Sequence, residues 1–165
     1  MKSKKIIISG PPGSGKTTII QELKTNDYKC FDEITPNVSD LGNKLNLSSV
    51  LFNKRKKQYE VESKKITFFD RSLIDVIAYM RYWKLEYPRD WELFVNENRY
   101  NKKVIYLPSW QNIYIQTRVR HEKFSEAQKI DSVLKKTYMD FKYELIVVPK
   151  TSIVERLKFI LNSIK

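Results

Sequence analysis

The stretch IIISGPPGSGKTTII, residues 6–20, decides the fold. A short β-branched run ends at Gly10, a glycine-rich turn follows, and a second apolar stretch begins after Lys16 and Thr17. Residues 10–17 match G-x-x-x-x-G-K-[ST] at every defined position, between a predicted strand at residues 4–9 and a predicted helix at residues 15–24. Because that context is the one the pattern requires, the sequence predicts a phosphate-binding loop.

The residue types of this loop explain the chemistry that we expect from it. Glycines let backbone N–H groups turn inward around an anion, and the following helix directs its positive end at the same place. We expect Lys16 to bridge the β- and γ-phosphates of ATP, and the Thr17 hydroxyl to be a ligand of Mg²⁺. The residues expected to contact the nucleotide are Gly10, Pro11, Pro12, Gly13, Ser14, Gly15, Lys16, Thr17 and Thr18.

Strands and helices are expected to alternate along the rest of the chain. Further strands are predicted at residues 28–31, 65–70, 103–108 and 144–149, and further helices within 37–63, at 72–84, after a capping box of Ser125 and Gln128, and from 151 onward. This alternation predicts an α/β fold of three layers, with a parallel sheet of about five strands and helices on both faces. At 165 residues we expect one domain, residues 1–165, with a lid segment around residues 110–126.

The segment FFDRSLID, residues 68–75, supplies the next candidates, because ligands of such sheets bind beyond the carboxyl ends of the strands. Asp70 ends an apolar strand, where a P-loop enzyme needs a carboxylate for Mg²⁺, usually through water. Arg71 either forms a local ion pair or holds a phosphate or carboxylate of a second substrate with its guanidinium fork. Asp75 either caps the helix that begins after Ser72 or contacts substrate.

An acidic pair, Asp32 and Glu33, follows the second predicted strand. If the acceptor of a phosphoryl group is a hydroxyl, a carboxylate beside the γ-phosphate is needed to take its proton. We predict this role for Glu33, with Asp32 as the substitute. The alternative is that Glu33 is an exposed loop acid.

The segment TRVRHEKFSEAQ, residues 117–128, lies between the fourth predicted strand and a helix. Arg118 and Arg120 could face one ligand and neutralise charge on a transferring phosphoryl group, as in a lid that closes over nucleotide and expels water. Glu122 would then hold one of these arginines in place. The alternative is a solvated, charge-rich helix start. His121 is the only histidine, so a histidine-based metal cluster is excluded.

Together these motifs resemble the small, kinase-like P-loop NTPases that are grouped with AAA-family ATPases. Those proteins carry a D-R-[GS]-x-x-D-x-x-A-Y segment, which DRSLIDVIAY (70–79) fits, and an ending similar to VPKTSIVERLKFIL (148–161). The layout is also similar to that of deoxynucleoside and thymidylate kinases. That likeness implies a nucleoside- or nucleotide-kinase-like fold, with Glu33 as base, Asp70 as the magnesium acid and Arg71 as the acceptor contact.

Composition and charge limit the environment and the partners. The chain has 41% hydrophobic and 30% charged residues, which is typical of a globular protein, and no apolar run approaches the roughly 18–20 residues of a membrane span. No secretory signal is recognisable, and a single cysteine, Cys30, fits a reducing compartment, so we expect a cytoplasmic protein. The net charge of +12 favours anionic ligands, nucleic acid among them, or reflects a lysine-rich solvated surface.

Three functions are compatible with these features. The first is an ATP-dependent phosphotransferase that moves the γ-phosphoryl group to a nucleoside, nucleotide or polynucleotide-like acceptor, with Mg²⁺ and catalytic roles for Lys16, Glu33, Asp70, Arg71, Arg118 and Arg120. The second is an ATPase or nucleotide-dependent switch without a small-molecule acceptor. The third is a nucleic-acid-binding module, which the net charge favours.

Overall fold

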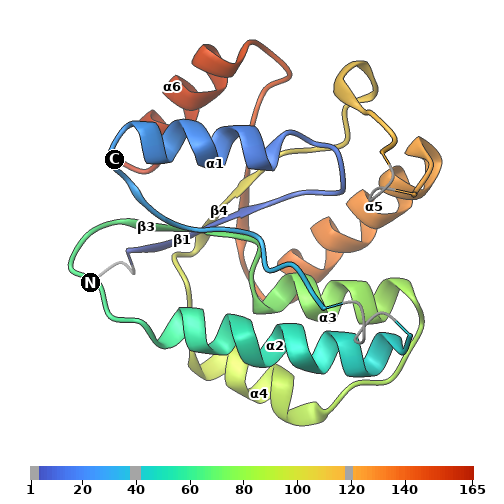
Figure 1. The fold of residues 1–165 in the computed structure, drawn as a ribbon. Helices are drawn as coiled ribbons and strands as arrows, with labels where there is room; N and C mark the ends of the chain where they lie inside the picture. The colour runs from blue at the N-terminus through green and yellow to red at the C-terminus, as the bar shows by residue number, and fades with distance from the viewer. Residues whose placement is uncertain (1–3, 38–41, 118–120) are drawn as a thin grey trace.

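A five-stranded parallel sheet lies between two layers of helices in the computed structural model, which describes residues 4–37, 42–117 and 121–165 (Figure 1). The strand order is β2-β3-β1-β4-β5, and every neighbouring pair is parallel. The strands are β1 (Lys5–Ser9), β2 (Lys29–Phe31), β3 (Thr67–Asp70), β4 (Lys103–Tyr106) and β5 (Glu144–Val147). The predicted three-layer α/β fold is therefore confirmed.

Alternation along the central strands divides the core into two parts. In β1, Ile6 and Ile8 face one side of the sheet and Ile7 faces the other, because successive side chains of a strand point in opposite directions. In β3, Phe68 and Phe69 divide in the same way. Both sides are apolar, which is why the strands read as continuous hydrophobic runs.

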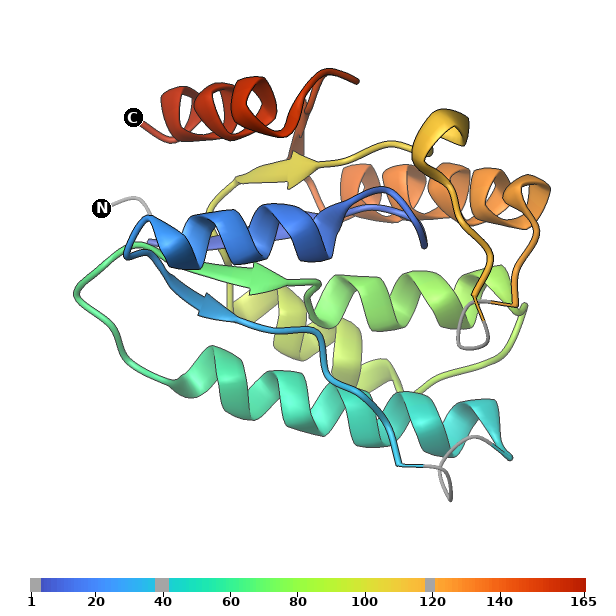
Figure 2. The same ribbon diagram turned by 45° about the horizontal axis from the view of Figure 1, so that its top comes forward.

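Within the residues that the structure describes, six α-helices cover the two faces (Figures 1 and 2). On the side of Ile6 and Ile8 lie α1 (Lys16–Thr25) and α6 (Ile153–Ser163). On the side of Ile7 lie α2 (Lys44–Glu60), α3 (Leu73–Tyr82), α4 (Arg89–Glu97) and α5 (Phe124–Asp140). A 3₁₀ turn, Gln111–Ile113, follows β4. No helix in the described part of the chain combines the length and apolar character needed to cross a bilayer.

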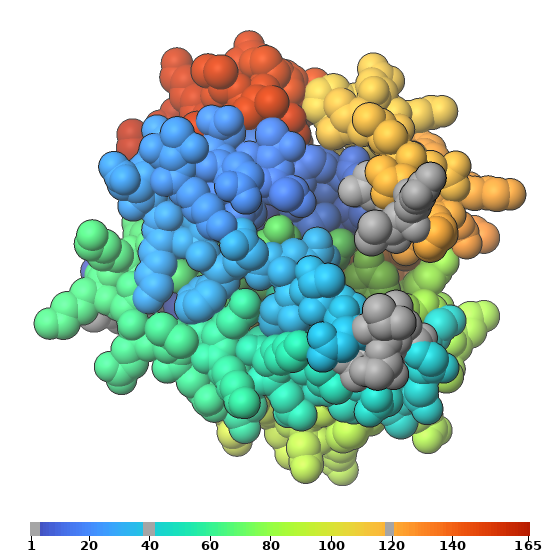
Figure 3. Space-filling model, viewed as in Figure 1, coloured from blue at the N-terminus to red at the C-terminus, as the bar shows by residue number. Residues whose placement is uncertain are grey.

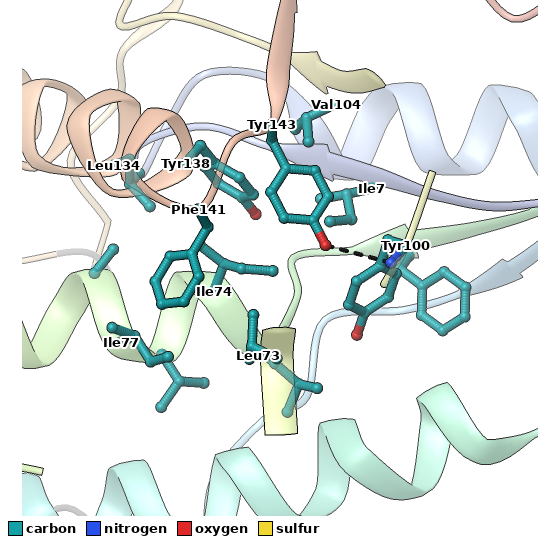
Figure 4. Packing of buried hydrophobic residues seen from close by; sticks show 14 of the residues in the cluster. Ile7, Leu73, Ile74, Ile77, Tyr100, Val104, Leu134, Tyr138, Phe141 and Tyr143 are labelled. Carbon is teal, nitrogen blue, oxygen red and sulfur yellow. Dashed lines mark hydrogen bonds between the residues drawn. The ribbon is translucent and has the colours of Figure 1, made fainter. Parts of the chain in front are cut away.

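The larger apolar cluster is rich in aromatic residues. Tyr138, Tyr143 and Tyr100 lie together between α5, β5 and the residues before β4, and the Tyr143 hydroxyl accepts a hydrogen bond of 3.3 Å from the Tyr100 amide (Figure 4). Farther out, the rings of Phe52 from α2 and Trp91 from α4 stack with their centroids 4.4 Å apart. Many of the aromatic side chains of this chain thus pack in the core.

Two details differ from the sequence predictions. The helix α4 was not expected at all, and it packs through Trp91 and Val95. The predicted capping box of Ser125 and Gln128 is wrong, because α5 begins earlier, at Phe124. There the Glu126 carboxylate accepts a hydrogen bond of 2.7 Å from the Lys123 amide, so the acid at the helix start takes the role assigned to Gln128.

A buried hydrogen-bond network fixes the ends of the central strands. The Asp75 carboxylate accepts hydrogen bonds from the Ser9 hydroxyl at the end of β1 (2.5 Å), from the amide and hydroxyl of Ser72, and from the Tyr138 hydroxyl of α5 (2.5 Å). Asp75 and Ser72 also form the capping box of α3. Of the two predicted roles for Asp75, the structure shows the helix cap.

We expect Tyr138→Phe to lower the free energy of unfolding by about 1.5–3 kcal/mol, because it removes a buried hydrogen bond to a carboxylate. Urea denaturation measures this change. Tyr28→Phe is the control, since the Tyr28 ring packs edge-on against Phe68 and its hydroxyl has no hydrogen bond within the described residues. A loss in Tyr138→Phe no larger than in Tyr28→Phe would contradict the importance of this network.

Candidate active site

The phosphate loop joins β1 to α1, as predicted, and its glycines have the backbone angles that their positions require. Gly13 and Gly15 adopt left-handed conformations, with φ of 71° and 90°. The φ of Gly15 disfavours any side chain there, and a Cβ atom would lie 2.8 Å from Nη1 of Arg156, so Arg156 would have to move aside. The loop is thus shaped by its own sequence before any ligand binds.

Lys16 lies folded against this loop. Its Nζ donates a hydrogen bond of 2.9 Å to the carbonyl of Pro11 and lies 3.4 Å from the Ser14 hydroxyl. Burial, together with the nearby Arg71, lowers the pKa of Lys16 to about 8. An ammonium group that is poorly solvated and has only neutral oxygens as partners is well suited to bind an incoming phosphate.

One cavity of about 550 Å³ connects the loop to four other parts of the chain. From the loop and the start of α1 it is lined by residues 12–18. The rest of its lining is Glu33, Arg71, Tyr79, Ile113, Thr117, Glu122, Ile153 and Arg156. In the face shown by Figure 3, the segment after β2 (light blue) lies below α1 (darker blue), and the residues after β4 (yellow to orange) lie beside it. Of the residues predicted to contact the nucleotide, Gly10 and Pro11 do not line this cavity.

Arg71 connects the phosphate loop to the acidic residue after β2. Its Nε donates to Oε1 of Glu33 at 2.7 Å, and its Nη1 donates to the carbonyl of Gly10 at 3.1 Å. Arg71 is buried and has a φ of 70°, a left-handed conformation that is costly for a residue other than glycine. The strained turn directs its guanidinium back over the loop instead of outward.

The predicted base, Glu33, therefore lies in the cavity, but as the partner of Arg71. The positive charge of Arg71 lowers the pKa of Glu33 to about 2, and the charge of Lys16 contributes in the same direction. A carboxylate with so low a pKa is a weak proton acceptor. Glu33 can become a stronger base only when Arg71 turns toward another anion.

Asp70 ends β3 beside Ile8 of β1, its partner in the sheet register. Its side chain is buried, and Oδ1 has no hydrogen-bond partner in the described part of the chain. Burial raises the pKa of Asp70, while the charges of Lys16 and Arg71 oppose this rise. The main-chain carbonyl of Asp70 is fixed by a hydrogen bond of 2.9 Å from Nη1 of Arg55.

These residues fit a magnesium ion held mainly by phosphate. A buried carboxylate oxygen without a partner calls for a cation or a water molecule bound to one. Within the described ranges no three His, Cys, Asp or Glu side chains cluster closely enough to hold a metal by themselves. Thr17, Asp70 and the phosphate oxygens would therefore share the ion, as Mg²⁺ in nucleotide sites commonly requires.

The other predicted site residues differ in where they lie relative to the cavity. Asp32 points away from the cavity and forms an ion pair of 2.6 Å with Lys24, so it is not placed to replace Glu33. Arg118 and Arg120 lie outside the described residues, and their predicted roles stay predictions. Glu122 lines the cavity, and its carbonyl accepts a hydrogen bond from the Tyr114 hydroxyl.

Sequence reasoning missed three residues around this site. Arg55 supports Asp70, Tyr79 lies with its ring centroid 5.5 Å from the guanidinium of Arg71, and Arg156 of α6 contacts the phosphate loop. One sequence feature could have identified both arginines. Each lies three or four residues from a buried apolar residue of its helix, and therefore on the buried face. Arg55 follows Phe52 by three residues, and Arg156 precedes Ile160 by four.

Comparison with known families decides the assignment. A family model, AAA_28, described as an AAA domain, matches residues 5–156. The chain belongs to this family. The resemblance inferred from the phosphate loop and the DRSLIDVIAY segment is thereby confirmed. Among curated proteins, no sequence matches the chain.

Solved structures, two kinases among them, share the fold. Deoxyadenosine kinase from M. mycoides, with dCMP and a flexible dCDP bound, has a TM-score of 0.74 and 21% identity, covering 98% of this chain and 100% of its own. Thymidylate kinase from Ehrlichia chaffeensis has a TM-score of 0.69 and 14% identity over the full length of both chains. YorR of Bacillus subtilis, in complex with phosphorylated GDP, has a TM-score of 0.67 and 18% identity over 97% of this chain and 95% of its own. The chain thus has the fold of nucleoside and nucleotide kinases.

The lowered pKa of Lys16 predicts how nucleotide affinity depends on pH. Below pH 8 Lys16 is charged in the free protein, and above pH 8 it loses its proton, which phosphate binding must restore. We expect the affinity for ATP without Mg²⁺ to fall about fivefold between pH 8 and 9, whereas Lys16 should contribute little change between pH 6 and 7. Calorimetry at each pH measures it, with proton uptake at pH 8.5 as a second readout. Lys16→Arg should bind ATP without this pH dependence, and an equal fall in that variant would contradict the assignment to Lys16.

Proposed function

We propose that this protein is an ATP-dependent phosphotransferase that moves the γ-phosphoryl group to a hydroxyl of a nucleoside, nucleotide or polynucleotide-like acceptor. The observation that carries the proposal is the position of Arg71, which lines one cavity together with Glu33 and residues 12–18. Its guanidinium donates hydrogen bonds to Glu33 and to the carbonyl of Gly10. A proton acceptor and an anion-binding group thus face the place where the γ-phosphate would lie. Membership of a P-loop family and the kinase fold support the same function.

In the proposed complex, two groups of cavity residues would face two ligands on either side of the γ-phosphate. Residues 12–18 would hold the triphosphate through backbone N–H groups, with Lys16 on the β- and γ-phosphates. Glu33, Arg71 and Tyr79 would line the place of the acceptor, where the guanidinium suits a phosphate or another anionic group. Mg²⁺ bound at Thr17 and Asp70 would neutralise charge on the phosphates.

The chemical step follows from this arrangement. The acceptor oxygen attacks the γ-phosphorus in line, the bond from that phosphorus to the β–γ bridging oxygen breaks, and ADP leaves. The proton of the acceptor hydroxyl passes to Glu33. For this, Arg71 must turn from Glu33 to the acceptor, which removes the positive charge that holds the pKa of Glu33 at about 2. Acceptor binding would therefore activate the base.

A lid would complete the site. The segment around residues 110–126 contributes Ile113, Thr117 and Glu122 to the cavity, and Arg118 and Arg120 lie within it by sequence. We propose that these two arginines neutralise charge on the transferring phosphoryl group when the lid closes. Residues 1–165 would then act as one catalytic domain.

The proposed reaction predicts a labelled acceptor when ATP carrying a γ-phosphate label is incubated with pooled nucleosides, nucleotides and 5′-hydroxyl oligonucleotides. Glu33→Gln should lower kcat about 10²–10⁴-fold, because it removes the proton acceptor. Asp32→Asn is the matched control, since Asp32 is the neighbouring acid and pairs with Lys24 outside the cavity, so its kcat should change less than about threefold.

Other results would separate the alternatives. Label released only as inorganic phosphate in every mixture would replace the transferase by the ATPase or switch. Oligonucleotide binding that depends on salt and survives Lys16→Ala would instead support a nucleic-acid-binding function. Equal activity of Glu33→Gln and Asp32→Asn would remove Glu33 from the mechanism.

The proposed metal role predicts a distinct behaviour of Asp70→Asn. The Mg²⁺ concentration for half-maximal activity should rise about 10–100-fold, because the ion loses its carboxylate partner. Stability to urea should not fall, because the Asp70 carboxylate is buried and its Oδ1 has no partner to lose. An unchanged Mg²⁺ requirement would contradict the metal role, whatever the stability.

A further inference from the structure

A second arginine contacts the phosphate loop from the flank opposite Arg71. Arg156 comes from α6, which follows the edge strand β5, whereas Arg71 follows β3, and the order β3-β1-β4-β5 puts β1 and its loop between them. Only 6% of Arg156 is exposed. Its Nη1 lies 2.8 Å and its Cζ 3.8 Å from the position that a Cβ of Gly15 would occupy. The guanidinium therefore occupies the space that the missing side chain leaves free.

Among the described residues, Arg156 has no carboxylate partner for its positive charge. Across residues 4–37, 42–117 and 121–165, no carboxylate oxygen lies within 4.0 Å of its guanidinium, whereas Arg71 and Arg81 both have such partners. Its Nε is buried and makes no hydrogen bond to any residue in these ranges. Burial without a nearby carboxylate lowers the pKa of Arg156, although a guanidinium stays protonated at neutral pH. An unpaired buried cation is costly, so a partner outside the chain is expected.

An aromatic ring orients this cation. The Cζ of Arg156 lies 5.4 Å from the ring centroid of Trp110, within the range of a cation–π interaction. Trp110 follows β4 and directly precedes the 3₁₀ turn. Ile113 of that turn also contacts this region, because its Cδ1 lies 3.4 Å from the position of a Cβ on Gly15. Arg156 lines the cavity together with residues 12–18. The guanidinium thus lies between Trp110 and Gly15, next to the loop that would carry the phosphates.

We propose that Arg156 binds the phosphate chain of the donor nucleotide, on the side of the loop opposite Arg71. The inference rests on the proposed nucleotide-binding function. It adds a residue that binds the donor nucleotide and not the acceptor. A planar guanidinium can donate two parallel N–H groups to phosphate oxygens, which a lysine ammonium cannot do. Phosphates seated against Gly15 would supply the anion that the protein lacks around Arg156.

The test compares two ligands that differ in the presence of a nucleoside. Binding of ATP and of inorganic tripolyphosphate, both without Mg²⁺, is measured by calorimetry for the wild type and for Arg156→Gln. Loss of a charged hydrogen bond to phosphate should raise Kd about 10–100-fold for both ligands. Lys158→Gln removes the same charge from an exposed position of the same helix and should change Kd less than about twofold.

Each result has a definite meaning. A loss of affinity for ATP alone, with tripolyphosphate unaffected, would overturn the proposal and place Arg156 on the base or ribose. Unchanged binding of both ligands would assign Arg156 a structural role through Trp110 and would also overturn it. A loss equal to that of Lys158→Gln would show only long-range electrostatics and would count against it as well.

A folding defect does not leave the question open. If Arg156→Gln does not fold, Arg156→Lys keeps the charge but not the planar fork, and the affinity for both ligands should fall by about 3–10-fold. As for Arg156→Gln, a loss for both ligands supports the proposal, and a loss for ATP alone overturns it. Failure of the transferase proposal is a separate outcome, because these measurements contain no acceptor. An ATP affinity that depends on Arg156, without any labelled acceptor, would refute transfer alone.

Discussion

The buried carboxylate of Asp75 is the interaction on which the candidate site depends. It receives hydrogen bonds from Ser9 at the end of β1, from Ser72 at the start of α3 and from Tyr138 of α5, and Nη1 of Arg71 lies 3.5 Å from it. A charged group without solvent is tolerated only where donors surround it, and these donors come from three different elements. The positions of the two strand ends and of α5 are therefore coupled through one side chain.

Arg71 extends this coupling to the ligand side. Its backbone is held in a left-handed conformation, and its guanidinium is shared among Asp75, Glu33 and the carbonyl of Gly10. Such strain persists only where the surroundings determine the geometry strongly. In the mechanism that we propose, the pairing of Arg71 with Glu33 has a protective effect. Water entering an empty acceptor site would meet a weak base, so the triphosphate would be conserved until the acceptor draws Arg71 away.

Much of the fold could be predicted from sequence because its signals are local. The phosphate loop is a contiguous pattern, the strands are continuous apolar runs, and the cap of α3 by Ser72 and Asp75 is a spacing of three residues. The helix α4 escaped prediction because only Trp91 and Val95 of its nine residues are buried. Pro88 before it and acids in its first turn were the usable signs of a helix start.

The parts of the site that sequence could not supply depend on where side chains point. Asp32 and Glu33 are equivalent in sequence, yet neighbours in an extended segment face opposite ways, and only the fold decides which one meets Arg71. The contact of Arg156 with Gly15 joins residues more than a hundred positions apart and depends on how α6 packs on α1. No pattern within one segment contains that information.

The order of the strands also has an evolutionary consequence. In the arrangement that we propose, β2, β3 and α3 carry the groups that meet the acceptor, while β4, β5 and α6 carry those that meet the donor, and the loop after β1 separates the two sets. The hydrogen bonds of Arg71 to Glu33 and to Gly10 involve no residue of β4, β5 or α6. A descendant of this chain could therefore exchange the molecule it modifies while keeping its energy source, through changes confined to one half of the sheet.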